Sequence, residues 1–184
     1  LRFSLCAAGY PIAAEIFNTE LYIATFCGVW KKPLHAGEES YVKAGPNDFF
    51  NNYTQGLYID RERDALYYAN ARLHKVDITN STSKKFFPLA SNAQITSVKI
   101  WKGDVFAATS ESGIWRLENG VWEEFNYGLS IQNNSNPSIT RTYIFKLEVI
   151  TNGDGEYLCA GTSIGLFCLN ENNEGWSDVS SPEL

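Results

Sequence analysis

The sequence predicts an all-β protein made of repeated four-stranded antiparallel sheets. The first observation is residues 102–125, which read as an apolar strand at 105–109, a polar turn ending in Gly113, a strand at 114–117, an Asn119-Gly120 turn and a third strand from Trp122. Turns this short join neighbouring antiparallel strands. The second observation is that this pattern recurs along the chain. The third is that the central strand of each copy is apolar on both faces.

Each copy of the repeat is a five-residue strand, a short turn ending in glycine and a further strand. Residues 21–31, 105–116 and 158–168 are clear copies, and residues 66–75 are a degenerate one. The equivalent positions, spaced 39 to 53 residues apart, are Thr25, Asn70, Thr109 and Thr162. Recurrence of this size indicates a repeat architecture. We expect one domain over 1–184 with repeats at roughly 12–45, 56–90, 94–126 and 142–180, and with 1–11 holding a strand, at 2–5, of a preceding or ring-closing repeat. Turns are also expected at 8–11 and at Asn18-Thr19, and strands at 85–89 and 143–150.

The central strands show how the repeats are arranged. In the first repeat Leu21 and Ile23 lie on one face of the strand, and Tyr22 and Ala24 lie on the other. A strand that is apolar on both faces must be covered on both sides. Radial stacking of four-stranded blades provides this cover. The sequence therefore predicts a β-propeller with about four four-stranded blades, either as a closed ring or as a segment of a larger or incomplete ring.

The closest copy of a known repeat is residues 156–169, Glu-Tyr-Leu-Cys-Ala-Gly-Thr-Ser-Ile-Gly-Leu-Phe-Cys-Leu. It resembles the blades of propellers built on the degenerate Asp-box (bacterial neuraminidase) repeat and on the two-component-regulator propeller repeat, whose consensus looks like L-W-x-G-T-x-x-G-L. Traces of the Asp box itself remain at 118–122 and 172–176. The resemblance implies the architecture and not an activity, because the group includes sialidases, glycan hydrolases, sorting receptors, sensors and assembly factors.

The composition of the chain argues against some classes of partner. It has 184 residues, 44% hydrophobic and 20% charged, which predicts a soluble globular protein. No apolar run approaches the roughly 18 residues that span a bilayer. The net charge of −6 would repel a phosphate backbone, so we expect no nucleic-acid partner. The absence of methionine suggests a processed or excised chain.

The cysteines indicate no metal site. There is no CxxC spacing and only two histidines, so we expect no zinc and no other cofactor. Cys159 and Cys168 lie symmetrically about the turn at 163–164, which places them opposite each other in a hairpin. They can form a disulfide in an oxidising compartment, or they can be two small buried hydrophobic residues.

No candidate catalytic residues stand out. Arg116 occupies a strand position that Lys31 and Lys75 fill in other repeats, which indicates a repeated surface position rather than part of a carboxylate clamp. Residues 152–155, Asn-Gly-Asp-Gly, are better explained as a hairpin turn than as a calcium loop. We therefore expect a protein that is not an enzyme.

The candidate ligand site is the face that collects the loops after the second and fourth strands of each repeat. Binding residues concentrate on loops held by a rigid scaffold. The predicted ligand-binding residues are Phe49, Phe50, Tyr53, Arg72, Tyr127 and Arg141. An alternative is that Phe49 and Phe50 fold inward. We expect a secreted or extracytoplasmic binding or scaffold protein that recognises a protein or peptide; the alternative is a carbohydrate-binding propeller or part of a glycan-active hydrolase.

Overall fold

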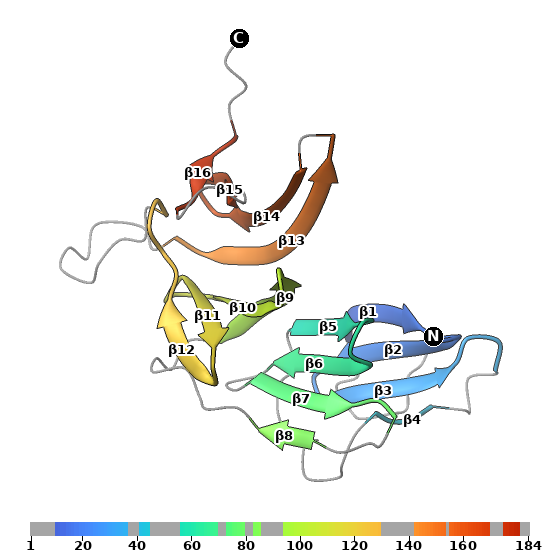
Figure 1. Cartoon of the computed structure of the whole chain (residues 1–184). Helices are drawn as coiled ribbons and strands as arrows, with labels where there is room; N and C mark the ends of the chain where they lie inside the picture. Colours follow the sequence, from blue (N-terminus) through green and yellow to red (C-terminus); the bar gives the residue numbers. More distant parts are fainter. Residues whose placement is uncertain are drawn as a thin grey trace. The chain divides into compact units, whose positions relative to one another are not determined.

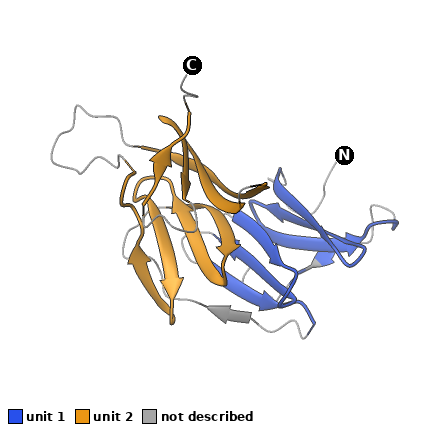
Figure 2. Cartoon of the chain, turned by 45° about the horizontal axis from the view of Figure 1, so that its top comes forward, with its two compact units in different colours: residues 1–88 blue, residues 89–184 orange. Residues whose placement is uncertain are grey.

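The computed structural model describes residues 10–36, 41–44, 56–69, 73–79, 83–85, 94–129, 142–153, 155–169 and 175–180. The regular structure in these ranges is β-strand, and the strands form four-stranded antiparallel sheets (Figure 1). The chain divides into two compact units, residues 1–88 and 89–184 (Figure 2). Each unit holds two sheets. The predicted all-β class and the four strands per repeat are confirmed.

In unit 1, strand order in each sheet follows the order of the chain. The first sheet consists of β1 (Pro11–Phe17), β2 (Glu20–Thr25), β3 (Gly28–Pro33) and β4 (Val42–Lys43). The second consists of β5 (Gly56–Asp60), β6 (Ala65–Ala69), β7 (Leu73–Asp77) and β8 (Ser83–Lys85). Each sheet is therefore a meander.

Unit 2 repeats this organisation. Its first sheet consists of β9 (Ile95–Trp101), β10 (Asp104–Thr109), β11 (Ile114–Glu118) and β12 (Val121–Glu124). Its second consists of β13 (Ile144–Asn152), β14 (Gly155–Thr162), β15 (Gly165–Leu169) and β16 (Ser177–Asp178). The first strands of the two sheets run in the same direction. The Thr96 hydroxyl donates to the carbonyl oxygen of Ile144, and further along both strands Lys99 pairs with Glu148.

Tight turns join the strands where the sequence carries residues that tolerate positive φ. Asn119 and Gly120 have φ angles of 50° and 82°, and Asn18 and Thr19 have 44° and 65°. Two successive positive φ angles match the right-handed twist of a two-residue hairpin. The turns predicted at both places are confirmed.

Each sheet has two sides that alternate along its strands. We call forward side the side of the second strand that carries Tyr22, Tyr67, Phe106 or Cys159, and rear side the side that carries Ile23, Tyr68, Ala107 or Ala160. In unit 1 the core joins forward Tyr22 and Val29 of the first sheet to rear Leu66, Tyr68 and Val76 of the second. The forward side of one sheet thus packs on the rear side of the following one.

The same contact forms the core of unit 2. Phe106, Ala108 and Ile114 on the forward side of β9–β12 pack on rear residues of β13–β16. Those rear residues are Leu147, Leu158, Ala160, Phe167 and Leu169. All are buried, so within each unit the forward side of the first sheet and the rear side of the second cover each other.

Some strand boundaries differ from the prediction. β1 begins at Pro11, where the sequence predicts a turn; proline is tolerated at the first residue of an edge strand, and a bulge follows between Pro11 and Ala13. The strand predicted at 85–89 corresponds to β8, which ends at Lys85, and 86–93 lie outside the described residues. The strand predicted at 2–5 also lies outside them. Asn152 pairs directly with Gly155, so the hairpin turn predicted at 152–155 is confirmed.

Candidate functional site

A repeated threonine closes the turn between the second and third strands of three sheets. The hydroxyls of Thr25, Thr109 and Thr162 donate to the carbonyl oxygens of Gly28, Gly113 and Gly165, at 3.0, 2.8 and 2.8 Å respectively. The same hydroxyls accept the N–H groups of Cys27, Ser112 and Ile164. One side chain therefore satisfies two backbone groups in each turn, which explains the threonine and glycine of the repeat. These turns form part of the face on which the sequence predicts a ligand.

Three large apolar side chains are exposed at this end of the last sheet. Tyr143, Phe145 and Ile164 are 38%, 58% and 47% exposed, and we call them the loop-face patch. The rings of Tyr143 and Phe145 lie 5.2 Å apart at an angle of 38°. Tyr143 and Ser163 exchange hydrogen bonds, because the Ser163 N–H donates to the Tyr143 carbonyl and the Ser163 hydroxyl accepts the Tyr143 N–H. The patch is therefore held against a closed turn.

A bulge explains why Phe145 is exposed. The register of β13 on β14 shifts between Ile144 and Lys146, so Phe145 has no direct partner on β14. Ile144 is fully buried in the core of unit 2, and the residues on both sides of it point outward. Bulges redirect side chains at sheet edges and near functional sites.

The structure describes one of the six predicted ligand-binding residues. Tyr127 is 82% exposed, and its ring lies against Gly175, where an added Cβ would come within 2.5 Å of the ring. The carbonyl of Tyr127 accepts the N–H of Trp176. Tyr127 thus belongs to a contact between the segment after β12 and the segment before β16. The other five, Phe49, Phe50, Tyr53, Arg72 and Arg141, lie outside the described residues and stay predictions.

Sequence reasoning did not single out the loop-face patch. Tyr143 and Phe145 fall inside a predicted strand at 143–150, where the alternation of side chains between the two faces suggests a regular edge strand without a bulge. The available signal was that Tyr143 and Phe145 flank an isoleucine that the apolar pattern places in the core. The bulge at Ile144–Lys146 is the part that the pattern does not specify.

A cluster of charged side chains links β9 and β13, the first strands of the two sheets in unit 2. Glu148 accepts from Lys99 on β9 and forms a second ion pair with Lys146 at 3.4 Å. Partial burial opposes ionisation of Glu148, but these two lysines outweigh burial and lower the pKa of the carboxyl group below its ordinary value. The pair joins β9 to β13 as a structural link.

Arg116 is engaged by carboxylates of its own sheet. It is half-buried and pairs with Glu118, with Glu123 at 3.6 Å and with Asp104 at 4.0 Å. Its guanidinium also lies 5.2 Å from the centre of the Phe125 ring. Arg116 lies on the forward side of β9–β12. The sequence predicted a surface position for Arg116, and the structure adds that its side chain covers the edge of the core of unit 2.

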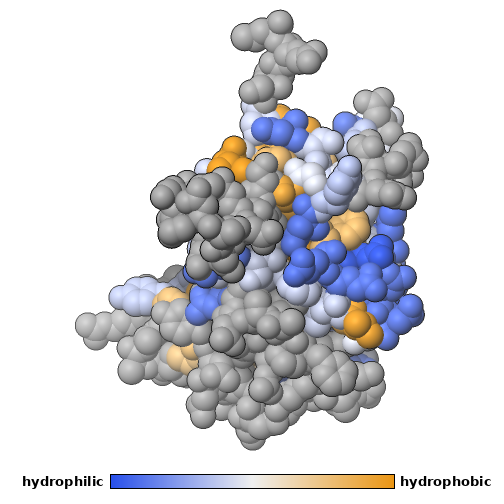
Figure 3. All heavy atoms as spheres, turned by 90° about the vertical axis from the view of Figure 1, so that its left-hand side faces the viewer, coloured by the Kyte–Doolittle hydropathy of each residue, from blue (hydrophilic) through white to orange (hydrophobic). Residues whose placement is uncertain are grey.

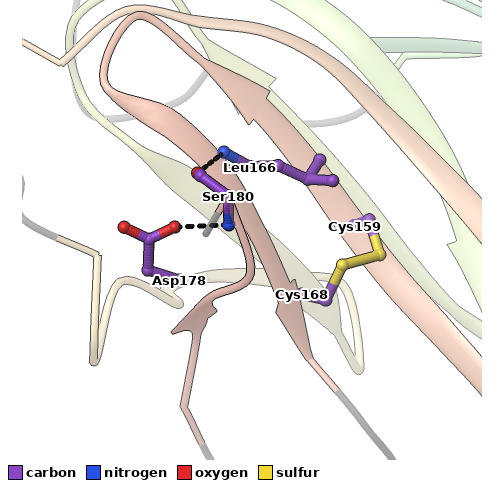
Figure 4. Close-up of a disulfide and its surroundings, with 5 residues drawn as sticks. All are labelled: Cys159, Leu166, Cys168, Asp178 and Ser180. Carbon is purple, nitrogen blue, oxygen red and sulfur yellow. Dashed lines mark hydrogen bonds between the residues drawn. A yellow bond between two sulfur atoms is a disulfide. The ribbon is translucent and has the colours of Figure 1, made fainter. Parts of the chain in front are cut away.

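A disulfide joins Cys159 and Cys168, which pair directly across β14 and β15 (Figure 4). Figure 4 also shows the segment after β16, where the Ser180 hydroxyl accepts the N–H of Leu166 and the Ser180 N–H donates to Asp178. Hydrogen bonding to Asp178 from the side chain and the backbone N–H of Ser180 lowers the pKa of this carboxyl group. Cys27 is also disulfide-bonded. Of the two alternatives for Cys159 and Cys168, the structure has the disulfide.

The described residues show neither a metal-binding cluster nor a membrane-spanning helix. Within the described ranges, no group of three or more histidine, cysteine, aspartate or glutamate side chains is arranged to hold a metal ion. Among the same residues no helix is long and apolar enough to cross a bilayer. On the face drawn in Figure 3, hydrophobic residues of the described surface form small separate clusters among hydrophilic ones. Apolar area alone therefore does not single out a site on that face.

Comparison with known proteins identifies the class of fold. No protein-family model and no curated protein sequence matches the chain. Solved structures match closely in fold: the β-propeller domain of Cps50 (Swd1) from Myceliophteria thermophila has a TM-score of 0.62 at 12% identity, over 93% of this chain and 55% of that one. The fold is therefore of the β-propeller type, as predicted.

Two bacterial structures match equally well. They are the extracellular domains of BT3049 and BT4673 from B. thetaiotaomicron, each named as a hybrid two component system, with TM-scores of 0.63 and 0.59 and 16% identity. They match over 94% of this chain but only 25% and 28% of their own length. The chain thus spans between a quarter and about half of these solved chains. The Asp-box kinship and the choice between a closed ring and a segment stay predictions.

Proposed function

We propose that this chain is a non-enzymatic propeller that binds a protein or peptide partner through the loop face of its second unit. The observation that carries the proposal is the loop-face patch of Tyr143, Phe145 and Ile164. Single exposed hydrophobic residues are ordinary on protein surfaces, but grouped ones often mark interaction sites. Here three of them lie on one turn and the adjoining strand.

The rigidity of the patch supports this proposal. Thr162 closes the turn that carries Ile164, and Ser163 ties that turn to the backbone of Tyr143. A side chain held in place before binding loses less conformational entropy in the complex. Tyrosine and phenylalanine supply much of the contact area in protein interfaces. These properties favour recognition of an apolar side chain on a partner.

The cysteines and the structural relatives support an extracytoplasmic location. Cys27, Cys159 and Cys168 are all disulfide-bonded, and disulfides persist mainly in oxidising compartments. BT3049 and BT4673 are extracellular domains.

The state of Arg116 supports the proposal that the chain is not an enzyme. Its guanidinium is already paired with three carboxylates of its own sheet. A carboxylate-binding clamp would need that cation unpaired.

Selection of peptides from a random phage-displayed library tests the proposal. The wild-type chain is immobilised, and selected peptides are then measured by calorimetry against two variants. Phe145→Ser combined with Ile164→Ser removes most of the patch. Val121→Ser is the matched control, because Val121 is 62% exposed on the edge strand β12 of the other sheet. We expect the double variant to weaken binding by about tenfold or more, which is about 1.4 kcal/mol, and the control to leave it unchanged.

Two outcomes would contradict the proposal. Peptides that bind both variants as tightly as the wild type would show that the patch is not the site. A parallel panel of oligosaccharides, assayed for binding and for released sugar, covers the alternative functions. Specific binding of a glycan with no selected peptide would favour a carbohydrate-binding propeller, and sugar release would make the chain an enzyme.

A further inference from the structure

The two-residue turn between β11 and β12 leaves reactive groups of Asn119 and Gly120 open to water. Glu118 pairs with Val121 across the hairpin, so the two turn residues lie outside the ladder. Both are exposed, and within the described part of the chain neither the Asn119 side-chain amide nor the Gly120 N–H forms a hydrogen bond. A Cβ added at Gly120 would have nothing within 4 Å. These groups are therefore accessible, without hydrogen bonds and without steric hindrance.

An asparagine followed by glycine carries both partners of an intramolecular reaction. The electrophile is Cγ of the Asn119 side-chain amide, and the nucleophile is the backbone nitrogen of Gly120 once it has lost its proton to water. Attack forms a bond between this nitrogen and Cγ and closes an imide ring, while the Cγ–NH₂ bond breaks and ammonia leaves. Two groups held next to each other in one chain react at a high effective concentration. Glycine favours the step, because it has no Cβ to obstruct the ring.

We propose that Asn119 is a site of chemical modification, at which asparagine is converted to aspartate and isoaspartate without an enzyme. Water opens the imide at either of its two carbonyl carbons. Attack at Cγ restores the ordinary backbone and gives aspartate, whereas attack at the backbone carbonyl carbon leaves Gly120 attached to Cγ and gives isoaspartate. The co-reactant is water alone. This inference is independent of the loop-face patch and of the proposed function.

A second turn of the same kind has a different residue after its asparagine. Asn18 and Thr19 form the two-residue turn between β1 and β2, and both are exposed. Their φ angles are 44° and 65°, and those of Asn119 and Gly120 are 50° and 82°. The backbone geometry of the turn therefore restricts both asparagines in a similar way. Thr19, however, is branched at Cβ, so its stiff side chain crowds the nitrogen that must attack.

The chain has one further Asn-Gly pair, at 152–153. Asn152 is the last residue of β13 and pairs with Gly155 in the ladder. Its backbone has to leave this ladder before the imide can form, whereas Asn119 lies in the turn and only has to rotate. We therefore expect Asn119 to react before Asn152.

Conversion of Asn119 changes the hairpin that carries the turn. Isoaspartate adds a methylene group to the backbone of a turn whose two positive φ angles match the twist of the strands. Either product also adds a carboxylate next to Glu118, which together with Glu123 already pairs with Arg116. The longer backbone and the added negative charge both weaken the pairing of β12 with β11.

Peptide mapping by mass spectrometry tests the proposal on the full chain after incubation at mildly alkaline pH and body temperature. Incubation in water enriched in oxygen-18 labels the conversions that occur before digestion. We expect Asn119 to be converted faster than Asn18 by about tenfold or more, which is about 1.4 kcal/mol in the barrier. Chromatography separates the two products. Isoaspartate identifies the imide route, because direct hydrolysis of the amide gives aspartate alone.

Two variants exchange the residue that controls the reaction. Thr19→Gly creates the Asn-Gly pair in the matched turn and should raise the rate at Asn18 by about tenfold or more. Gly120→Ala should lower the rate at Asn119 by a similar factor. Circular dichroism establishes that both variants are folded.

A synthetic peptide with the sequence of residues 116–123 is the reference for the unfolded chain. If this peptide is converted while Asn119 of the folded chain stays intact, the fold protects the site and the proposal is overturned. Equal rates at Asn119 and Asn18, or aspartate without isoaspartate, also overturn it. A Thr19→Gly variant that reacts no faster at Asn18 would show that the following residue does not control the rate, which contradicts the argument from Gly120.

Discussion

Cys159 and Cys168 occupy the cross-strand position that an aromatic residue and a cation occupy in the other three sheets. The equivalent pairs are Tyr22 with Lys31, Tyr67 with Lys75 and Phe106 with Arg116. In unit 1 the lysine ammonium groups lie 5.8 and 5.5 Å from the centres of the tyrosine rings. The last sheet replaces this non-covalent pair with a covalent bond.

The first prediction concerns this disulfide. It closes a loop with a sequence separation of nine residues, and the loss of such a constraint is expected to lower the free energy of unfolding by about 2–3 kcal/mol on chain-entropy grounds. We expect Cys159→Ala combined with Cys168→Ala to show this loss in urea-induced unfolding followed by tryptophan fluorescence. The reference is a Leu166→Ala variant, which removes an exposed apolar side chain of the same side and keeps the bond. Equal stability of the double variant and the wild type would contradict the prediction.

The second prediction concerns the threonine that closes the turn between β10 and β11. Thr109 is fully buried, donates to the Gly113 carbonyl and accepts the Ser112 N–H. Thr109→Val keeps the shape of the side chain but leaves the Ser112 N–H without its acceptor, and the Gly113 carbonyl then keeps only the backbone N–H of residue 109. We expect a loss of about 1–3 kcal/mol in the free energy of unfolding.

Thr109→Ser separates the two contributions of this side chain. It keeps the hydroxyl and removes one methyl group, so we expect a smaller loss, about 1 kcal/mol. If Thr109→Val costs almost nothing while Thr109→Ser costs about 1 kcal/mol, the methyl packing and not the hydroxyl stabilises the turn. Hydrogen exchange of the Ser112 amide gives a local readout, and it should accelerate in the valine variant alone.

The sequence predicted those parts of the fold that depend on local pattern. The equivalence of Thr25, Thr109 and Thr162 located the turns, and the Asn119-Gly120 pair located a hairpin, because each needs only residues close in the chain. The opposition of Cys159 and Cys168 followed from symmetry about one turn. Hairpin register is fixed by the turn, so such features can be read without tertiary information.

Features that depend on distant residues could not be read in this way. The ring of Tyr127 lies on Gly175, which is far away in the sequence, and nothing local to either residue specifies that contact. The exposure of Phe145 depends on a bulge that forms because Ile144 enters the core of unit 2. Arg116 looked like a surface repeat because its partners Asp104 and Glu123 come from neighbouring strands.

The third prediction concerns pH. Because Lys99 and Lys146 lower the pKa of Glu148 in the folded chain, this carboxylate contributes stability that is complete above its ordinary pKa of 4.5 and is lost as the pH falls through the lower, folded-state value. We expect Glu148→Gln to reduce the steepness of acid unfolding below about pH 4.5, with a cost at pH 7 of about 1 kcal/mol or less, since Glu148 is partly exposed.

The control for this experiment is Glu156→Gln on β14, because within the described part of the chain Glu156 forms no ion pair. Acid titration followed by circular dichroism should show that this variant and the wild type lose structure in parallel. An unchanged acid transition in Glu148→Gln would mean that the link between β9 and β13 does not contribute to stability.

The last prediction concerns Gly128, in the segment that packs on the start of β16. Its φ is +85°, and a Cβ added there would lie 2.2 Å from the carbonyl oxygen of Trp176. The Trp176 N–H also bonds to Tyr127, and its indole N–H donates to Phe125, so this backbone is held on several sides. Gly120 is the matched control, because its φ of +82° is nearly the same but nothing lies within 4 Å of the added Cβ. Gly120→Ala is therefore expected to cost only the left-handed backbone penalty, about 1–2 kcal/mol. Gly128→Ala should cost that penalty plus the displacement of Trp176, a total of about 3 kcal/mol or more. Chemical unfolding measures both variants, and equal losses would show that the segments at 126–129 and 175–176 are not packed together in solution.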